Sequence, residues 1–167
     1  MIEALTIIHQ RGYEDWTLKI AGWGNIDAIR ETARKRGIDD HIQFLGSLDR
    51  PTLAAELANS DLAILPSHIE NFGLSIAEAQ ACGLPVVSYR VGSIPEVIKD
   101  GQTAILVDLY DYAKLTDAII FIIDHPDLAH EMGRKGQKFI RDHFSWQKAA
   151  SEMLSTISAI KIEKSLR

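Results

Sequence analysis

The chain is poor in cysteine, in long apolar runs and in excess positive charge. Its 167 residues include a single cysteine, Cys82, which excludes an intrachain disulfide and a thiolate metal cluster. The longest apolar run, 118–123, is far shorter than the about 20 residues that cross a bilayer. Residues 1–4 do not resemble a signal peptide, because no basic residue precedes the apolar ones. These features predict a soluble, cytoplasmic protein.

The charge balance excludes one class of partner. The net charge is −5 at pH 7, whereas a protein that binds nucleic acid needs a cationic surface for the phosphate backbone. Hydrophobic residues make up 46% of the chain and charged residues 25%, as in ordinary globular proteins, and the length suffices for a domain with a core. We therefore expect one domain over residues 1–167 that does not bind nucleic acid.

Apolar segments typical of strands alternate with segments typical of helices. Gly37 ends one predicted helix, Pro51 lies in the first turn of the next, and Ser145 is placed to cap the last. Strands that alternate with helices predict right-handed βαβ units, and hence an α/β fold with a parallel sheet and a helical C-terminal extension. We predict strands at 16–21, 41–45, 62–65, 85–89 and 104–107, and helices at 26–36, 50–59, 93–98, 112–124, 126–142 and 146–161, with a further helix after the third strand.

The most informative segment lies between the third and fourth predicted strands. There Glu70 and Glu78 stand either side of the expected helix start, with seven residues between them. A loop with a glycine that opens a helix after a strand is where an open α/β sheet binds anionic ligands. The backbone amides of Phe72, Gly73 and Leu74 would suit a phosphate, and the two carboxylates would suit sugar hydroxyls. The alternative is a tight turn into the helix that binds no ligand.

The order of short motifs along the chain is more specific than any one of them. In sequence they are Gly-x-Gly at 22–24, Ile-Gln-Phe-Leu-Gly at 42–46, Asp-Leu-Ala-Ile-Leu-Pro-Ser at 61–67, Glu-Asn-Phe-Gly-Leu-x3-Glu-Ala-x-Ala-Cys-Gly-Leu-Pro-Val-Val at 70–87 and Pro-Glu-Val-Ile-x-Asp-Gly at 95–101. This order resembles the C-terminal, donor-binding domain of retaining GT-B glycosyltransferases of family 4 (glycosyl transferases group 1). The resemblance covers about residues 18–146. It implies a Rossmann-like sheet and transfer of a sugar from a nucleotide-sugar to an acceptor hydroxyl, with no metal and no other cofactor.

The resemblance implies roles for the residues of this loop. Glu70 would face the donor sugar near the reacting carbon and stabilise an oxocarbenium-like transition state. Without the resemblance, an exposed loop glutamate is the favoured interpretation of Glu70. Asn71, Phe72, Gly73 and Leu74 would bind the donor, with their amides at its diphosphate.

Two further residues have two interpretations each. Glu78 would bind the ribose hydroxyls of the nucleotide, but Ser75-x-x-Glu78 also has the spacing of a capping box. Ligand binding is favoured only if the helix begins earlier, near Gly73, so that Glu78 lies inside it. Gly22 would line the donor cleft or simply form a turn after the first strand. Cys82 lies among alanines on the same helix, where we expect a small buried core residue.

Two parts of such an enzyme have no counterpart in this sequence. One is the N-terminal domain that holds the acceptor. The other is the first strand of the C-terminal domain, with the arginine and lysine that grip the diphosphate, because residues 1–5 look like the middle of the helix that follows. That strand is central in the order 3-2-1-4-5-6, so the strands at 16–21 and 62–65 would each lack a partner. We expect a truncated product or half of a split enzyme, marginally stable and prone to self-associate.

The expected function is that of the donor-binding half of a glycosyltransferase, inactive without its N-terminal domain. The alternative is a non-catalytic nucleotide-sugar-binding fragment or subunit of a split enzyme. Residues 145–167 would form the crossover helix and tail, and Trp146 would expose apolar surface where the chain returns to the missing domain. The basic tail residues fit either weak membrane-surface association or plain solvation: Lys161, Lys164 and Arg167.

Overall fold

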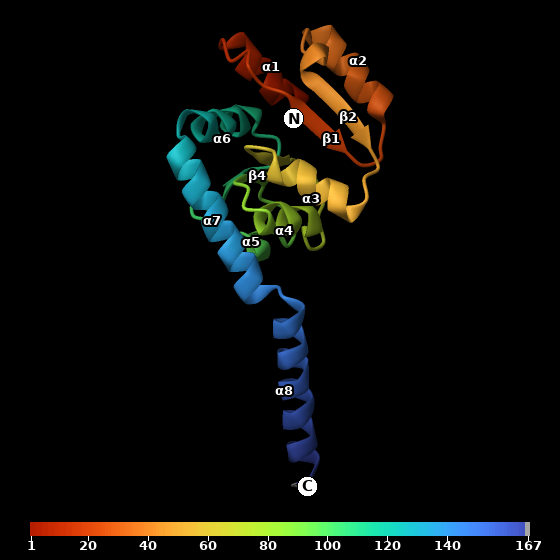
Figure 1. The fold of residues 1–167 in the computed structure, drawn as a ribbon, viewed down its shortest axis with the longest axis vertical. Coiled ribbons are helices and arrows are strands. Elements are labelled where there is room, and N and C mark those ends of the chain that lie inside the picture. The colour runs from red at the N-terminus through yellow and green to blue at the C-terminus, as the bar shows by residue number, and fades with distance from the viewer. Residues whose placement is uncertain (166–167) are drawn as a thin grey trace.

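The computed structural model describes residues 1–165, with side chains through residue 160, and consists of helices around short parallel strands (Figure 1). The strands and helices alternate as the sequence predicts. In chain order they are α1 (Ile2–Gln10), β1 (Leu18–Ala21), α2 (Ile26–Arg36), the 3-10 turn η1 (Asp39–His41), β2 (Ile42–Gly46), α3 (Arg50–Ala58), β3 (Ala63–Leu65), α4 (Leu74–Ala81), β4 (Val86–Tyr89), α5 (Ile94–Val97), β5 (Ala104–Val107), α6 (Tyr112–Asp124), α7 (Pro126–His143) and α8 (Trp146–Ser165).

Capping interactions in the structure explain the helix boundaries that the sequence predicts. The side chain of Asn25 accepts a hydrogen bond from the Ala28 amide at the start of α2, and Gly37 ends that helix in the left-handed conformation. Asp49 caps α3 in the same way ahead of Pro51. Ser145 caps α8 through a 3.2 Å bond from the Lys148 amide. Local capping chemistry therefore accounts for the starts of these three helices and for the end of α2.

The strands form two groups rather than one continuous sheet. β1 pairs with β2, and β4 lies between β3 and β5; every pairing between these strands is parallel. This arrangement confirms the predicted α/β class. Each group also ends in the strand, β1 or β3, that the predicted order would place beside the first strand of the domain.

Buried side chains form two clusters that meet at β4. One cluster lies among α1, α2 and α6 and includes Ile8, Ala33 and Leu115, and the other joins α4, α5 and β5. All four residues of β4 are buried, whereas β1 alternates between partly buried and exposed residues and all of β3 is partly exposed. Burial is therefore most complete at β4 and least complete at β1 and β3, the strands that border the gap between the two groups.

Helix α8 extends away from the rest of the molecule (Figure 1). Trp146 at its start is 89% exposed, which confirms the expectation of apolar surface there. Further along the helix Met153, Leu154 and Ile157 are exposed as well. In the part of the chain that the structure describes, no helix is both long and apolar enough to cross a membrane. The basic tail residues Lys161, Lys164 and Arg167 lie outside the described side chains.

Candidate functional site

The candidate site is the loop that joins the carboxyl end of β3 to α4. Gly73 is the N-cap of α4, with φ +84°, and no side chain caps the helix. The amides of the first helical turn, Leu74, Ser75 and Ile76, are therefore free to receive an external acceptor. Together with the partial positive charge of the helix end they favour an anion.

Gly73 is required at this position for two structural reasons. Its positive φ is a conformation that side chains rarely adopt. A Cβ atom there would also lie 3.2 Å from Cγ2 of Val97, which belongs to α5. The sharp entry into α4 therefore depends on glycine.

Glu70 and Asn71 form the part of the loop before the helix. Glu70 is half-buried, so the expectation of a plainly exposed loop glutamate is wrong. Its Oε1 atom accepts a 3.1 Å hydrogen bond from the Asn71 amide, which folds the carboxylate back over its own loop. The Asn71 carbonyl accepts a hydrogen bond from the hydroxyl of Ser93, in the turn before α5. Phe72 is 45% exposed, and its ring packs in a T-shaped arrangement with that of Phe144, with the centroids 5.7 Å apart.

The position of Glu78 excludes one of its two interpretations. Helix α4 begins at Leu74, so Glu78 is its fifth residue, and Ser75 is inside the helix rather than at its N-cap. The capping-box interpretation is therefore wrong. Glu78 is half-buried and lines a cleft of about 370 Å³ between α3 and α4, which is compatible with ligand binding.

The cleft is mostly apolar, with charged groups of both signs. Arg50 and Glu78 are its charged residues. Leu74, which is 58% exposed, and Trp146 contribute apolar surface. Cys82 also lines the cleft and is only half-buried, so the expected core position is wrong. Burial first, and the charge of Glu78 second, raise the pKa of the Cys82 thiol. The thiol is therefore protonated at neutral pH and is not an activated nucleophile.

Gly22 lies in the other group of strands, directly after β1. Its φ is +117°, and its amide donates a 2.7 Å hydrogen bond to the Gly46 carbonyl at the end of β2. This bond continues the β1–β2 pairing by one residue, and donor binding by Gly22 stays a prediction.

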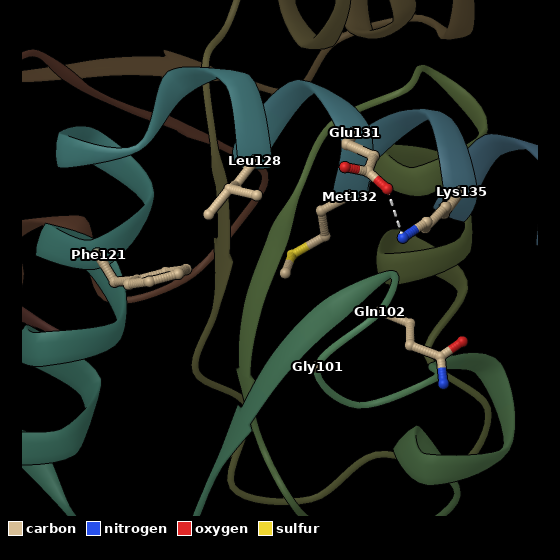
Figure 2. Close-up of a pocket in the computed structure, with 7 residues that line it drawn as sticks. All are labelled: Gly101, Gln102, Phe121, Leu128, Glu131, Met132 and Lys135. Atoms are coloured by element: carbon tan, nitrogen blue, oxygen red, sulfur yellow. Dashed lines mark ion pairs between the residues drawn. The ribbon is translucent and has the colours of Figure 1, made fainter.

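A smaller hollow of about 120 Å³ lies at the opposite edge of the strands, near the start of β5 (Figure 2). Phe121, Leu128 and Met132 provide its apolar wall, and Glu131 and Lys135 form an ion pair of 2.7 Å beside it. None of the predicted site residues lines it. Over residues 1–160 no group of three or more histidine, cysteine, aspartate or glutamate side chains is placed to hold a metal ion.

Sequence reasoning underestimated the turn between β4 and α5. Gly92 and Ser93 lie against the Glu70–Asn71 backbone, although 22 residues separate Ser93 from Asn71. Ser93 is the N-cap residue of α5, but its side chain makes no capping hydrogen bond. The sequence signal available was a glycine and a serine directly after a strand that borders the site.

Comparison with known proteins identifies the family of this chain. The family model described as "Glycosyl transferases group 1" matches residues 1–139. The chain belongs to this family. It is thus a glycosyltransferase domain with the GT-B C-terminal fold, as the order of motifs predicts.

The relatives in this family are longer proteins. A glycogen synthase of Mycobacterium tuberculosis (strain ATCC 25618 / H37Rv) is 35% identical over 153 residues, which are 91% of this chain and 37% of the relative. A D-inositol 3-phosphate glycosyltransferase of Arthrobacter sp. (strain FB24) is 37% identical over 74% of this chain and 29% of its own length. The chain thus spans about a third of the curated relatives that it matches.

Solved structures show the same relationship. Sucrose-phosphate synthase from Thermosynechococcus elongatus superposes with a TM-score of 0.84 and 25% identity over 97% of this chain and 42% of its own. The C-terminal domain of a group 1 glycosyl transferase, LpcC from Francisella tularensis, superposes with a TM-score of 0.76 and 25% identity over 87% of this chain and 77% of its own. Anabaena Alr3699/HepE in complex with UDP-glucose has a TM-score of 0.82 at 23% identity over 95% of this chain and 44% of its own, which indicates a shared fold alone.

Proposed function

We propose that this chain is the donor-binding half of a retaining, family 4 glycosyltransferase of the cytoplasm. It would bind a nucleotide-sugar whose sugar is then transferred to an acceptor hydroxyl. The observation that carries the proposal is the start of α4 directly after Gly73. This start leaves the first amides of the helix without a side-chain cap and puts Glu78 inside the helix, on the wall of the cleft.

The amides at the start of α4 would bind the donor diphosphate. A helix N-terminus combines free N–H groups with partial positive charge, which suits a phosphate without requiring a metal. Asn71, Phe72, Gly73 and Leu74 form the entry to this helix end. The glycine at 73 lets a ligand approach the backbone closely.

The carboxylates of Glu78 and Glu70 would bind the ribose and the sugar of the donor, respectively. Glu78, on the wall of the cleft, would accept hydrogen bonds from the ribose hydroxyls. Glu70, on the loop before the helix, would face the sugar and stabilise the positive charge that develops at its reacting carbon. In a front-face reaction the leaving phosphate would itself take the proton of the acceptor, so Glu70 need not act as a nucleophile.

The working enzyme would contain more than this chain. The interrupted sheet supports this view, because β1 and β3 each end a group at the position beside the predicted first strand. We propose that a further strand pairs with both edges, and that an acceptor-binding half completes the active site. The chain on its own would then bind the donor but transfer no sugar. The same interrupted sheet favours the second candidate, a non-catalytic nucleotide-sugar-binding subunit.

Calorimetric titration with UDP, GDP and their glucose conjugates tests the proposal. UDP is the first choice because the related fold of Anabaena HepE was solved with UDP-glucose. We expect saturable binding of one nucleotide, weakened in Glu78→Gln and unchanged in Glu131→Gln, a matched change beside the hollow of Figure 2. A folded chain that binds none of these compounds would overturn the proposal.

Addition of the complementary half separates the two candidates. If this chain is half of a split enzyme, it should transfer sugar only when a protein that carries the N-terminal half is present. If a complex forms but transfers no sugar, the binding-subunit candidate is the correct one.

A further inference from the structure

The turn between β4 and α5 contacts the backbone of the site loop, the loop that joins β3 to α4. Ser93 is the N-cap of α5, yet its side chain makes no capping hydrogen bond. Its hydroxyl instead donates to the backbone carbonyl of Asn71. An N-cap serine normally accepts from its own helix, so this hydroxyl serves the loop rather than the helix that it begins.

Gly92, the preceding residue, brings the turn against the backbone of Glu70. A Cβ atom built on Gly92 would overlap the Glu70 carbonyl oxygen and lie 3.1 Å from the carbonyl carbon. The φ of Gly92 is +51°, which also favours glycine. The turn therefore contacts two successive carbonyl groups of the loop, those of Glu70 and Asn71.

The two carbonyl groups determine where the next two amides point. A peptide unit is planar and trans, so its N–H is directed opposite to its C=O. Because Ser93 holds the Asn71 carbonyl, the Phe72 amide must point away from the turn. The contact of Gly92 with the Glu70 carbonyl likewise directs the Asn71 amide, which donates to the Glu70 carboxylate at 3.1 Å.

Helix α5, which follows the turn, is fixed to helix α4. At the far end of α5, the Val97 carbonyl accepts a 2.7 Å hydrogen bond from the buried side chain of Gln80, a residue of α4. Val97 also lies against Gly73. α5 and its preceding turn therefore form a support whose position relative to the start of α4 is set by buried contacts.

We propose that Ser93 and Gly92 are positioning residues for the donor site. This inference rests on the proposed function. The turn directs the Phe72 amide toward the diphosphate of the donor, and it sets the peptide on which the Glu70 carboxylate rests. Neither residue touches the donor; both act through the loop.

The test compares Ser93→Ala and Ser93→Thr with the unchanged full chain, labelled with ¹⁵N and titrated with UDP and, in a parallel series, with GDP. Ser60→Ala is the matched control, because it removes another hydroxyl-to-carbonyl bond, 2.8 Å to Glu56, outside the site loop. The readouts are the dissociation constant from calorimetry and the ligand-induced shift of the Phe72 amide signal. Thermal unfolding of each variant confirms that it is folded.

We expect Ser93→Ala to weaken nucleotide binding about 2- to 10-fold, the effect of one hydrogen bond, and to reduce the Phe72 amide shift. Ser93→Thr, which keeps the hydroxyl, should retain the wild-type affinity and the wild-type Phe72 shift. Ser60→Ala should change neither the affinity nor the shift. A folded Ser93→Ala chain with unchanged affinity and an unchanged Phe72 shift would overturn the positioning role alone. A wild-type chain that binds neither nucleotide would overturn the proposed function, and the positioning role with it.

Discussion

The buried side-chain amide of Gln80 donates a 2.7 Å hydrogen bond to the backbone carbonyl of Val97 and so ties α4 to the end of α5. Gly136 of α7 packs on the same side chain, since a Cβ atom there would lie 3.2 Å from Gln80. Three helices therefore meet at one polar residue without exposing it. The amide is satisfied through its nitrogen alone, because Oε1 of Gln80 is buried and has no hydrogen-bond partner among the described residues.

Gln80→Ala should lower the free energy of unfolding by about 2–3 kcal/mol. The substitution leaves a cavity under Gly136 and removes the donor from the Val97 carbonyl. Urea unfolding followed by circular dichroism measures the change. Gln102→Ala, at an exposed glutamine, should stay within about 0.5 kcal/mol of the wild type, and equal losses in both variants would contradict the role of Gln80.

Exposed strand edges should make the chain associate in solution. β1 and β3 each end a group of parallel strands, and such an edge presents unpaired backbone donors and acceptors to other chains. Sedimentation velocity over a range of concentrations should show reversible oligomers. Thermal unfolding should be broad rather than sharply cooperative.

The exposed stripe of α8 offers a competing explanation for association. Met153→Lys combined with Leu154→Lys places charge on that helix and leaves the strands untouched. If the strand edges drive association, this double variant should still form oligomers. A wild-type chain that stays monomeric and unfolds cooperatively at every concentration would contradict the prediction that the edges of β1 and β3 drive association.

Glu78 should contribute to binding and not to stability. Because α4 begins at Leu74, neither Ser75 nor Glu78 is placed to cap the helix. Ser75→Ala and Glu78→Gln should therefore each change the free energy of unfolding by less than about 0.5 kcal/mol. If a capping box were present, its loss would lower the free energy of unfolding by about 1 kcal/mol in either variant. A decrease of that size in both variants, measured by urea unfolding, would restore the rejected interpretation.

The sequence predicted those features that depend on local chemistry. The structure reproduces the predicted bounds of α2 and α6. Side-chain caps at Asn25 and Asp111, together with Gly37 at the end of α2, explain these bounds. The start of α4 was ambiguous because Ser75-x-x-Glu78 fits both a cap and a helix interior. The left-handed conformation of Gly73 decided it, and this conformation depends on the β3–α4 turn rather than on the spacing.

Tertiary contacts between distant segments were beyond the sequence pattern. The hydroxyl of Ser93 had a local use as a helix cap, and only the fold shows that it bonds Asn71 instead. Cys82 looked like a core residue because its neighbours are alanines, but α3 lies far enough from α4 to leave a cleft beside it. Such positions require knowledge of which helices face each other.

Gly73→Ala should lower the free energy of unfolding and weaken nucleotide binding. Gly12→Ala is the control that separates backbone strain from the contact with Val97. The two glycines have similar backbone conformations, with φ of +84° and +90°, so each alanine suffers the same strain of about 1 kcal/mol. A Cβ atom at Gly12 meets nothing within 4 Å, whereas one at Gly73 lies 3.2 Å from Val97. We therefore expect Gly73→Ala to lose about 1 kcal/mol more than Gly12→Ala in urea unfolding. Because the added methyl group also displaces the entry to α4, nucleotide binding measured by calorimetry should weaken in Gly73→Ala alone. Equal stability losses with unimpaired binding would show that the start of α4 tolerates a side chain at this position, and that its geometry is not what presents the amides to a ligand.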